Sequence, residues 1–182
     1  MCFVDLYRRP YTIDDIFDHR EINLILNKSK NMLKKSHTVG SDNPTVRKSK
    51  STFLAIDTDT DRLTSKIAHM VGLQDRICEL VQVVRYDPGD YYKPHQDTCC
   101  FETCRGKSDV DKRIKTVIVY LNDDFQGGET CFPNLDMCIE PKRGRALVFN
   151  TYDMLNRCTR KALHEGRPVR DGTKYICTFW FR

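Results

Sequence analysis

The sequence has no long apolar run, no internal repeat and no low-complexity segment. A helix needs about 20 mostly apolar residues to span a bilayer, and no stretch of the 182 residues approaches that length. Residues 1–11 carry Asp5, Arg8 and Arg9 and contain no apolar core of a secretory signal. We therefore expect a protein that is not inserted in a membrane and is located in the cytoplasm.

The chain also has no strong excess of charge of one sign. Its 30 Lys and Arg residues against 25 Asp and Glu residues give a net charge of +5. Part of this excess lies in an early basic cluster formed by Lys28, Lys30, Lys34, Lys35, Arg47, Lys48 and Lys50. Aromatic residues do not alternate with these cations as they do where nucleic-acid bases stack, so we interpret the cluster as solvated surface and expect no nucleic-acid partner.

Cysteine, in contrast, is abundant, with nine residues. Without a secretory signal, the default is reduced thiols. Four of the cysteines lie in strand-like runs, where a reduced cysteine serves as a small core residue: Cys78, Cys131, Cys138 and Cys177. Cys99, Cys100 and Cys104 lie close together in a polar stretch, where free thiols, a disulfide or a metal clip all remain open.

The N-terminal half predicts two amphipathic helices. Asp18 and Glu21 form a capping-box pattern, and apolar residues then recur at helical spacing, which predicts a helix over 19–35; they are Ile22, Ile25, Leu26, Met32 and Leu33. A second apolar series predicts a helix that ends near Gly72; it consists of Leu63, Ile67, Met70 and Val71.

After residue 74 the pattern changes to β-strands. Runs rich in strand-forming residues cover 77–85, 114–121, 146–150 and 174–181, with Gly- and Pro-containing turns between them. Many short strands with such turns indicate a sandwich or barrel. The sequence therefore predicts a mainly β protein of the α+β class, with its helices packed outside a β-sandwich.

A possible metal site begins at His95 and Asp97. Side chains two residues apart in an extended segment point to the same side, so this imidazole and carboxylate can converge. His164, in a strand-like stretch over 161–164, is the best candidate for a third ligand. Two histidines and one carboxylate suit a non-haem Fe(II) oxygenase. On its own the triplet is more typical of a surface or capped-turn histidine than of a metal site.

Lys174 opens a strand that is apolar on both sides. Ile176, Thr178 and Trp180 share its face, so the lysine is expected to project into the interior, where its charge needs a partner. A dicarboxylate cosubstrate would supply one. The competing interpretation is a lysine at a strand end whose ammonium reaches water.

Further hydroxyl groups could line the same interior. Thr116 and Tyr120 share one face of their strand, while Tyr86 and Tyr92 flank the turn that leads to His95. Taken singly, each is more typical of an ordinary core residue that makes one hydrogen bond.

Read together, these segments resemble the prolyl 4-hydroxylases. The matching blocks occur in the same order and spacing as in that family; they are 85–97 (RYDPGDYYKPHQD), 116–122 (TVIVYLN), 127–133 (GGETCFP), 140–146 (EPKRGRA) and 164–169 (HEGRPV), followed by Lys174 and Trp180. Arg47-Lys48-Ser49 resembles an earlier element of the family. The lysine at 174 is typical of the collagen-type, plant, algal and viral members.

The resemblance implies one domain over 1–182, with helical support over 12–73 and a double-stranded β-helix (jelly-roll) core over 77–182. It implies Fe(II) bound by His95, Asp97 and His164. The distal carboxylate of 2-oxoglutarate would bind Lys174, and the other cosubstrate-binding residues would be Tyr86, Thr116, Tyr120 and Trp180. Tyr92 and Arg47 would contact the substrate. O2 and ascorbate complete the expected reactants.

The implied activity is 4-hydroxylation of proline in a proline-rich or collagen-like chain held in polyproline II form. Three alternatives remain at this point: the same chemistry on another side chain or small molecule, a non-catalytic jelly-roll binding module, and a nucleic-acid hydroxylase that uses the early basic cluster. Residues 98–113 correspond to a loop over the substrate in the family.

Overall fold

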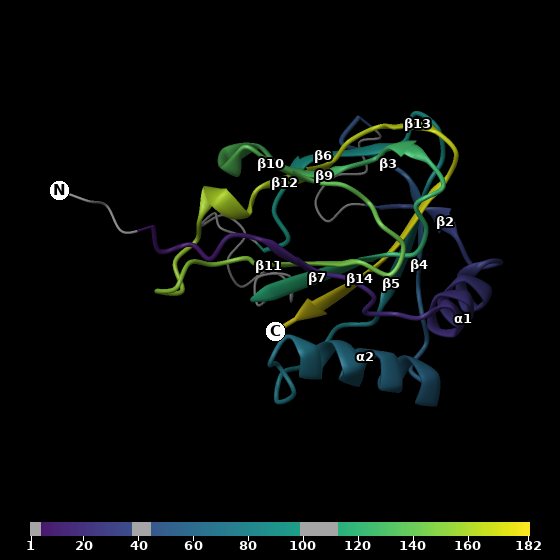
Figure 1. Cartoon of the computed structure of the whole chain (residues 1–182), viewed down its shortest axis with the longest axis horizontal. Coiled ribbons are helices and arrows are strands. Elements are labelled where there is room, and N and C mark those ends of the chain that lie inside the picture. Colours follow the sequence, from purple (N-terminus) through teal and green to yellow (C-terminus); the bar gives the residue numbers. More distant parts are fainter. Residues whose placement is uncertain (1–4, 38–44, 99–112) are drawn as a thin grey trace.

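The protein consists of two facing β-sheets with two helices on one side (Figure 1). The computed structural model describes residues 5–37, 45–98 and 113–182. The larger sheet has seven strands, in the order β1 (Tyr11–Ile13), β11 (Ala146–Asn150), β7 (Lys115–Tyr120), β14 (Lys174–Phe181), β5 (Gln82–Tyr86), β4 (Lys50–Phe53) and β2 (Lys34–Lys35). The predicted mainly β, α+β class is confirmed.

The smaller sheet carries most of the candidate metal ligands. Its five strands follow the order β10 (Met137–Ile139), β9 (Thr130–Phe132), β12 (His164–Gly166), β6 (Tyr91–His95) and β3 (Arg47–Lys48). A two-stranded ribbon pairs β13 (Val169–Asp171) with β8 (Gln126–Gly127). There are two short 3-10 helices in the described chain. In the sequence, η2 (Pro133–Leu135) directly follows β9, and η3 (Arg160–Ala162) precedes β12.

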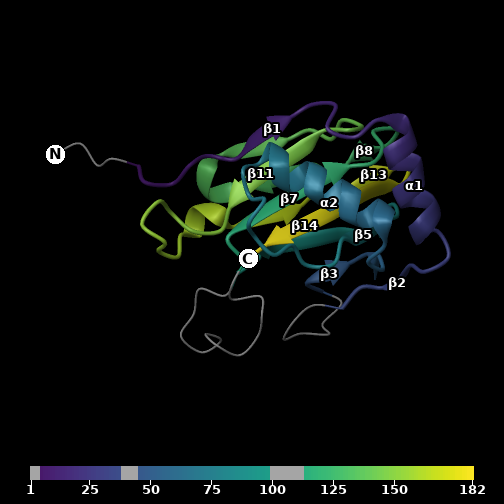
Figure 2. The ribbon, with the colours of Figure 1, turned by 90° about the horizontal axis from the view of Figure 1, so that it is seen from below.

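Helices α1 (His19–Ser29) and α2 (Thr58–Met70) pack on the outer face of the seven-stranded sheet, as Figure 2 shows for α2. The predicted capping box is present, because the Asp18 carboxylate accepts from the backbone N–H of Glu21 at 2.8 Å and the Glu21 side chain accepts from the N–H of Asp18. The helix residues that share a buried cluster with the sheet include Ile22, Ile25, Leu63 and Ile67. In the described part of the chain, no helix is long and apolar enough to cross a membrane.

Several predicted boundaries are wrong at the N-terminal end. The helix expected over 19–35 ends at Ser29, and Lys34 and Lys35 form β2, since the edge of β4 offers them backbone partners. Met32 is exposed and does not continue the buried stripe, and in α2 the same is true of Met70. The part expected to give only helical support also contributes strands β2, β3 and β4.

The strand predictions are better, although the first is displaced. The strands expected over 146–150 and 174–181 match β11 and β14, and 114–121 encloses β7. The run expected over 77–85 becomes β5 only from Gln82. Before it, Cys78 forms only an isolated antiparallel bridge with Phe181, and Ile77 and Leu80 are exposed. The strand-like stretch over 161–164 is instead η3 followed by β12, which begins at His164.

Strand β14 divides the interior as its alternation predicts. Cys177, Phe179 and Phe181 face the helices in one buried cluster, whereas Ile176 lies in the second cluster, between the two sheets. Lys174 shares the Ile176 face by period-2 spacing. The lysine is therefore in the inter-sheet space, with the candidate metal ligands.

The cysteine prediction needs correction. Cys131 and Cys138 form a disulfide between β9 and β10, so they are not reduced core residues, and Cys138 is exposed. Cross-strand positions in an antiparallel pair bring these two side chains together. Cys177 is a buried free thiol as expected, whereas Cys78 is only half-buried. Cys99, Cys100 and Cys104 lie outside the described residues.

Candidate active site

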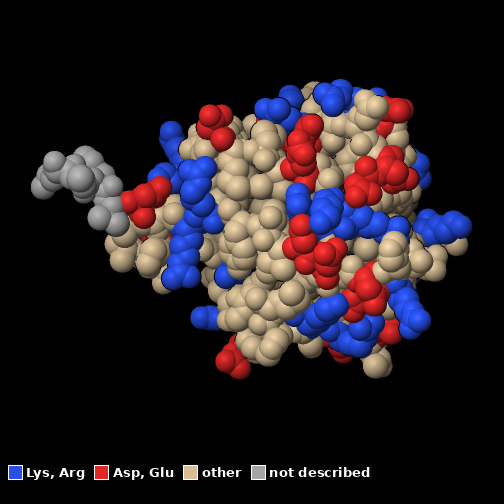
Figure 3. All heavy atoms as spheres, in the orientation of Figure 1, with Lys and Arg blue, Asp and Glu red and all other residues tan. Residues whose placement is uncertain are grey.

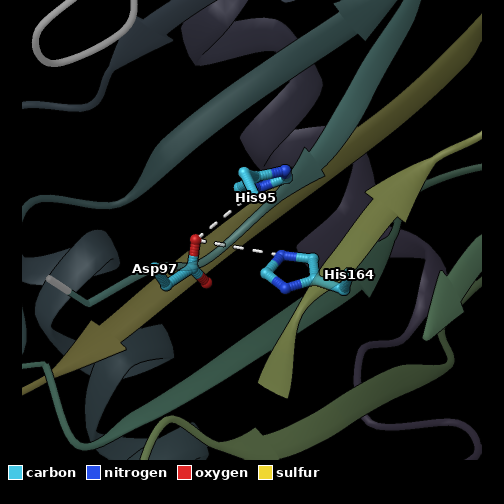
Figure 4. Close-up of side chains that lie close together, drawn as sticks. All are labelled: His95, Asp97 and His164. Atoms are coloured by element: carbon cyan, nitrogen blue, oxygen red, sulfur yellow. Dashed lines mark ion pairs between the residues drawn. The ribbon is translucent and has the colours of Figure 1, made fainter. Parts of the chain in front are cut away.

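The three candidate ligands converge in the space between the sheets (Figure 4). Their ligand atoms all lie within 4.8 Å of one another. Asp97 Oδ1 is 3.8 Å from the Nε2 atom of each histidine. Antiparallel pairing of β12 with β6 sets His164 directly opposite His95, and Asp97 follows two residues after β6 ends. This set of one carboxylate and two imidazoles fits an Fe(II) site.

Hydrogen bonds orient both imidazoles for metal binding. His95 Nδ1 lies 2.8 Å from the Lys93 carbonyl oxygen, and His164 Nδ1 lies 3.0 Å from that of Ala162. A carbonyl only accepts, so each Nδ1 carries the proton and each Nε2 keeps a free lone pair for a metal. Burial and the neighbouring His164 lower the pKa of His95 to about 3, which favours the neutral ligand form.

Aromatic rings hold the histidines in place. The Tyr92 ring stacks on His95 with a centroid distance of 3.4 Å and an interplanar angle of 14°. Phe149 and Phe132 lie 4.7 and 5.6 Å from the ring centroid of His164, which is only 3% exposed. These contacts restrict rotation of the ligands and exclude water from one side of the site.

The two oxygens of Asp97 have separate roles. Its Oδ2 accepts a 2.6 Å hydrogen bond from Thr116 Oγ1, while Oδ1 faces the two histidines. Burial by itself raises the pKa of this carboxyl, but His164, His95 and the Thr116 hydroxyl outweigh that effect, so the pKa is lowered. The carboxylate is therefore ionised and has one oxygen free for a metal.

Removing this hydrogen bond should weaken metal binding. In Thr116→Val, the buried Oδ2 loses its donor and Asp97 can rotate, so we expect metal affinity to fall about 10- to 100-fold. Isothermal titration with Mn(II) measures the effect. Thr116→Ser should retain near wild-type affinity, and Thr178→Val, at a buried threonine of β14, is the matched control. Equal affinity in the Val and Ser variants at position 116 would contradict a role for the hydroxyl.

Lys174 is buried near the triad with little to neutralise it. The residue is 2% exposed, and its ammonium donates to the Gly128 carbonyl at 2.7 Å. The rings of Tyr86 and Tyr120 lie beside it, with centroids 5.1 and 5.5 Å from Nζ. Burial lowers the pKa of Lys174 to about 7, although Glu129 partly opposes this. An ammonium has three donors, so this one has the capacity to bind an anionic ligand.

A second group of polar residues borders the site along β3 and β6. Arg47 pairs with Tyr92 across the two strands, and its guanidinium carbon lies 4.7 Å from the centroid of the Tyr92 ring. Arg47 also donates to Ser49 Oγ at 2.8 Å and is only 9% exposed. The predicted substrate residues thus lie beside His95, since Tyr92 stacks on that ligand.

Sequence reasoning missed Arg113 and Glu79, which surround Trp180. The Arg113 guanidinium lies 3.8 Å from the centroid of a Trp180 ring and donates twice to the Glu79 carboxylate, at 2.6 and 2.8 Å. A third contact, at 3.4 Å, reaches the backbone carbonyl of Asp97. The indole N–H of Trp180 is buried without a hydrogen-bond partner in the described chain. The only sequence feature that could have identified Arg113 as a site residue is its positive charge just before a predicted strand, which is a weak signal.

Comparison with known proteins identifies this arrangement. Residues 81–182 match the 2OG-Fe(II) oxygenase superfamily. A putative prolyl 4-hydroxylase of Acanthamoeba polyphaga mimivirus is 31% identical over 183 residues, which cover 98% of this chain and 76% of the relative. Prolyl 4-hydroxylase 1 of Arabidopsis thaliana is 33% identical over 119 residues, which cover 57% of this chain and 41% of that protein.

Solved structures agree with the sequence relatives. A viral collagen prolyl hydroxylase from Paramecium bursaria Chlorella virus-1, solved as a 2OG complex, superposes with a TM-score of 0.79 at 28% identity and 96% coverage of both chains. A Pseudomonas putida prolyl-4-hydroxylase, at 16% identity and a TM-score of 0.71, shows the same fold. The jelly-roll prediction is confirmed. The chain belongs to the 2OG-Fe(II) oxygenase superfamily, on the branch of the prolyl 4-hydroxylases.

Proposed function

We propose that this protein, as a single dioxygenase domain, hydroxylates proline at C4 in a polypeptide, with Fe(II), 2-oxoglutarate and O2 as reactants and ascorbate as the reductant that maintains activity. The observation that carries the proposal is the convergence of His95, Asp97 and His164 in an interior that also holds a buried, largely uncompensated Lys174. The similarity to proteins named prolyl 4-hydroxylase supports the choice of substrate class.

The triad is proposed to hold the iron through His95 Nε2, His164 Nε2 and Asp97 Oδ1. Bound iron, together with 2-oxoglutarate and O2, supplies the oxidation, which releases succinate and CO2 and hydroxylates the substrate. The chain itself fixes the tautomers through two backbone carbonyls and keeps the carboxylate ionised. Phe132 and Phe149 keep one side of the site dry.

Lys174 is proposed to bind the distal carboxylate of 2-oxoglutarate. A dicarboxylate would supply the counter-charge that the ammonium lacks, and a buried pair of opposite charges is stable only when it is hydrogen-bonded as well. Tyr86 and Tyr120 would line this end of the cosubstrate, as their rings flank the ammonium. Thr116 and Trp180, adjacent across β7 and β14, would lie nearer the metal.

The peptide is proposed to lie between the Arg47 side of the site and the Trp180 side. Aromatic side chains border both sides, Tyr92 and Trp180, and aromatic-lined grooves suit the rings of a proline-rich chain in polyproline II form. The unpartnered indole N–H of Trp180 and the guanidinium of Arg47 are donors for its backbone carbonyls. Such a chain presents free carbonyls because it has no internal hydrogen bonds.

Mass spectrometry on a set of proline-rich peptides tests the function. With Fe(II), 2-oxoglutarate and ascorbate present, we expect a gain of one oxygen on proline coupled to an equal amount of succinate. Succinate formation without any oxidised peptide would instead indicate another substrate. No succinate with any substrate would support the non-catalytic alternative.

The nucleic-acid alternative has no comparable support. Three of the seven cations of the early basic cluster are paired with carboxylates, since Lys28 lies 2.5 Å from Asp57, Lys48 lies 3.0 Å from Asp90 and Lys50 lies 3.0 Å from Asp87. This finding agrees with its interpretation as solvated surface.

A further inference from the structure

A different basic surface lies at the end of the molecule where β6 ends and β12 begins. We call it the basic end surface; its six cations are Arg8, Arg9, Lys115, Arg157, Arg160 and Lys161. They come from the N-terminal segment, the start of β7 and the segment around η3. Figure 3 shows Lys and Arg side chains gathered over this end, in the left part of the view, where Figure 1 shows η3.

Contacts tie these segments into one surface. Arg9 donates to the Leu135 carbonyl of η2 at 3.1 Å, and Asn134 of η2 donates to the Arg160 carbonyl of η3 at 2.6 Å. Lys161 reaches Asp5 of the N-terminal segment at 2.6 Å. The N-terminal segment and the η3 segment, which are distant in sequence, therefore present their cations on one surface, and η2 links them without contributing a cation. Lys115 of β7 adjoins them, since the charge of Arg8 acts on it.

The charge of this surface is only partly balanced. Asp5 and Asp153 are already paired, with Lys161 and with Arg157 at 2.8 Å. Asp136 is the remaining acidic residue on these segments. Arg8, Arg9, Lys115 and Arg160 form no ion pair with any described residue. Burial, together with the nearby charge of Arg8, lowers the pKa of Lys115, as expected where cations crowd together.

The surface adjoins the active site through the segment that carries η3. Gln96, which lies between two triad residues, donates to the Thr159 carbonyl at 3.1 Å, and the Ala162 carbonyl holds His164. Thr98 and Tyr152 are hydrogen-bonded at 2.9 Å. Arg160 therefore directly follows Thr159, whose carbonyl contacts Gln96, and it precedes the candidate ligand His164 by four residues.

We propose that the basic end surface binds acidic residues that flank the target proline of the polypeptide substrate, so that the enzyme prefers prolines near Asp and Glu. The inference rests on the proposed function. A polyproline II chain advances about 3.1 Å per residue, so a substrate seated at the triad extends beyond the site within a few residues. Uncompensated cations at that exit attract acidic segments and accelerate their association, most strongly at low ionic strength.

The test compares peptides with one proline-rich core and a four-residue flank of Glu, Ser or Lys on either side. In the wild type we expect kcat/KM for a Glu-flanked peptide to exceed that of its Lys-flanked counterpart by roughly 10-fold or more at low salt, and the ratio to shrink with added salt. In the double variant Arg8→Glu/Arg160→Glu, both residues exposed, the preference should disappear or invert. The KM for 2-oxoglutarate should not change.

The matched control is Arg20→Glu/Arg170→Glu, on exposed residues of α1 and β13 at the other end of the molecule (Figure 1). It should retain the Glu preference. Fluorescence anisotropy with labelled peptides measures the binding preference without turnover. It therefore tests the inference even if no proline is oxidised. Absence of proline oxidation would contradict only the proposed function. Equal binding of the three flanks, or a Glu preference that survives in the Arg8/Arg160 variant, overturns the inference. Binding of a single-stranded DNA 12-mer to this surface, with no preference among the peptides that differ in their flanks, would also overturn the inference.

Discussion

His164→Ala is expected to abolish succinate release with every substrate. Loss of a residue that only orients a ligand typically costs about 10- to 100-fold in metal affinity or activity, and removal of the ligand itself should cost more. Alanine also leaves a cavity between Phe132 and Phe149, whose rings pack on the imidazole. The expected result is therefore a folded or slightly destabilised protein with no bound metal and no turnover.

Metal binding gives a readout that is independent of turnover. The chain has one tryptophan, Trp180, which pairs with the strand position that contacts Asp97. Titration with Co(II) should quench its fluorescence in the wild type and not in His164→Ala. His19→Ala, at an exposed histidine of α1, is the matched control and should behave as the wild type. Wild-type succinate release from His164→Ala would refute the assignment of the triad.

Lys174→Met is expected to raise the 2-oxoglutarate requirement and, at the same time, to stabilise the fold. Leaving a buried carboxylate without its charged partner costs about 2–5 kcal/mol, so the Kd for 2-oxoglutarate should rise roughly 30-fold or more. The stabilisation follows from the lysine itself. Folding moves its pKa from 10.5 to about 7, which corresponds to a cost on the order of 4 kcal/mol at neutral pH.

The stability difference should depend on pH in a defined direction. Because the pKa of Lys174 is lower in the folded state, the unfolded chain binds the extra proton between about pH 7 and 10.5. The wild type therefore gains stability as pH rises through that window. The advantage of Lys174→Met is expected to be largest below about pH 7 and to vanish near pH 10.5. Over the same window, 2-oxoglutarate binding to the wild type should weaken, since the lysine loses its charge.

Thermal melting without cosubstrate measures the first effect, at about 2–4 °C per kcal/mol for a chain of this size. Lys30→Met, at an exposed lysine after α1, should change neither Tm nor the Kd. A lower Tm for Lys174→Met together with unchanged 2-oxoglutarate affinity would contradict both parts of the prediction. A higher Tm together with weaker 2-oxoglutarate binding in Lys174→Met would support Lys174 as a cosubstrate residue.

The sequence predicts the features that depend on local geometry and misses those that depend on distant segments. The alternation of β14 predicts that Lys174 points to the same side as Ile176 and into the interior, because side chains in a strand alternate strictly. That this side faces the second sheet and not the helices is known only from the structure. The capping box at Asp18 and Glu21 is also predicted correctly, because it depends on local geometry alone. The end of α1 is not predicted correctly, since the edge of β4 gives Lys34 and Lys35 backbone partners that helical periodicity does not reveal.

The sequence alone determined the chemistry of the site: two histidines, one carboxylate and one lysine, in segments whose order matched one family. Tertiary structure decided how they meet. His164 lies opposite His95 only because β12 pairs with β6, and Arg113 meets Glu79 and Trp180 only because β7 and β14 are neighbours in the sheet. The Cys131–Cys138 disulfide likewise depends on the register of β9 and β10. Strand register is set by cooperative packing over the whole core, so contacts between distant segments cannot be read from either segment alone.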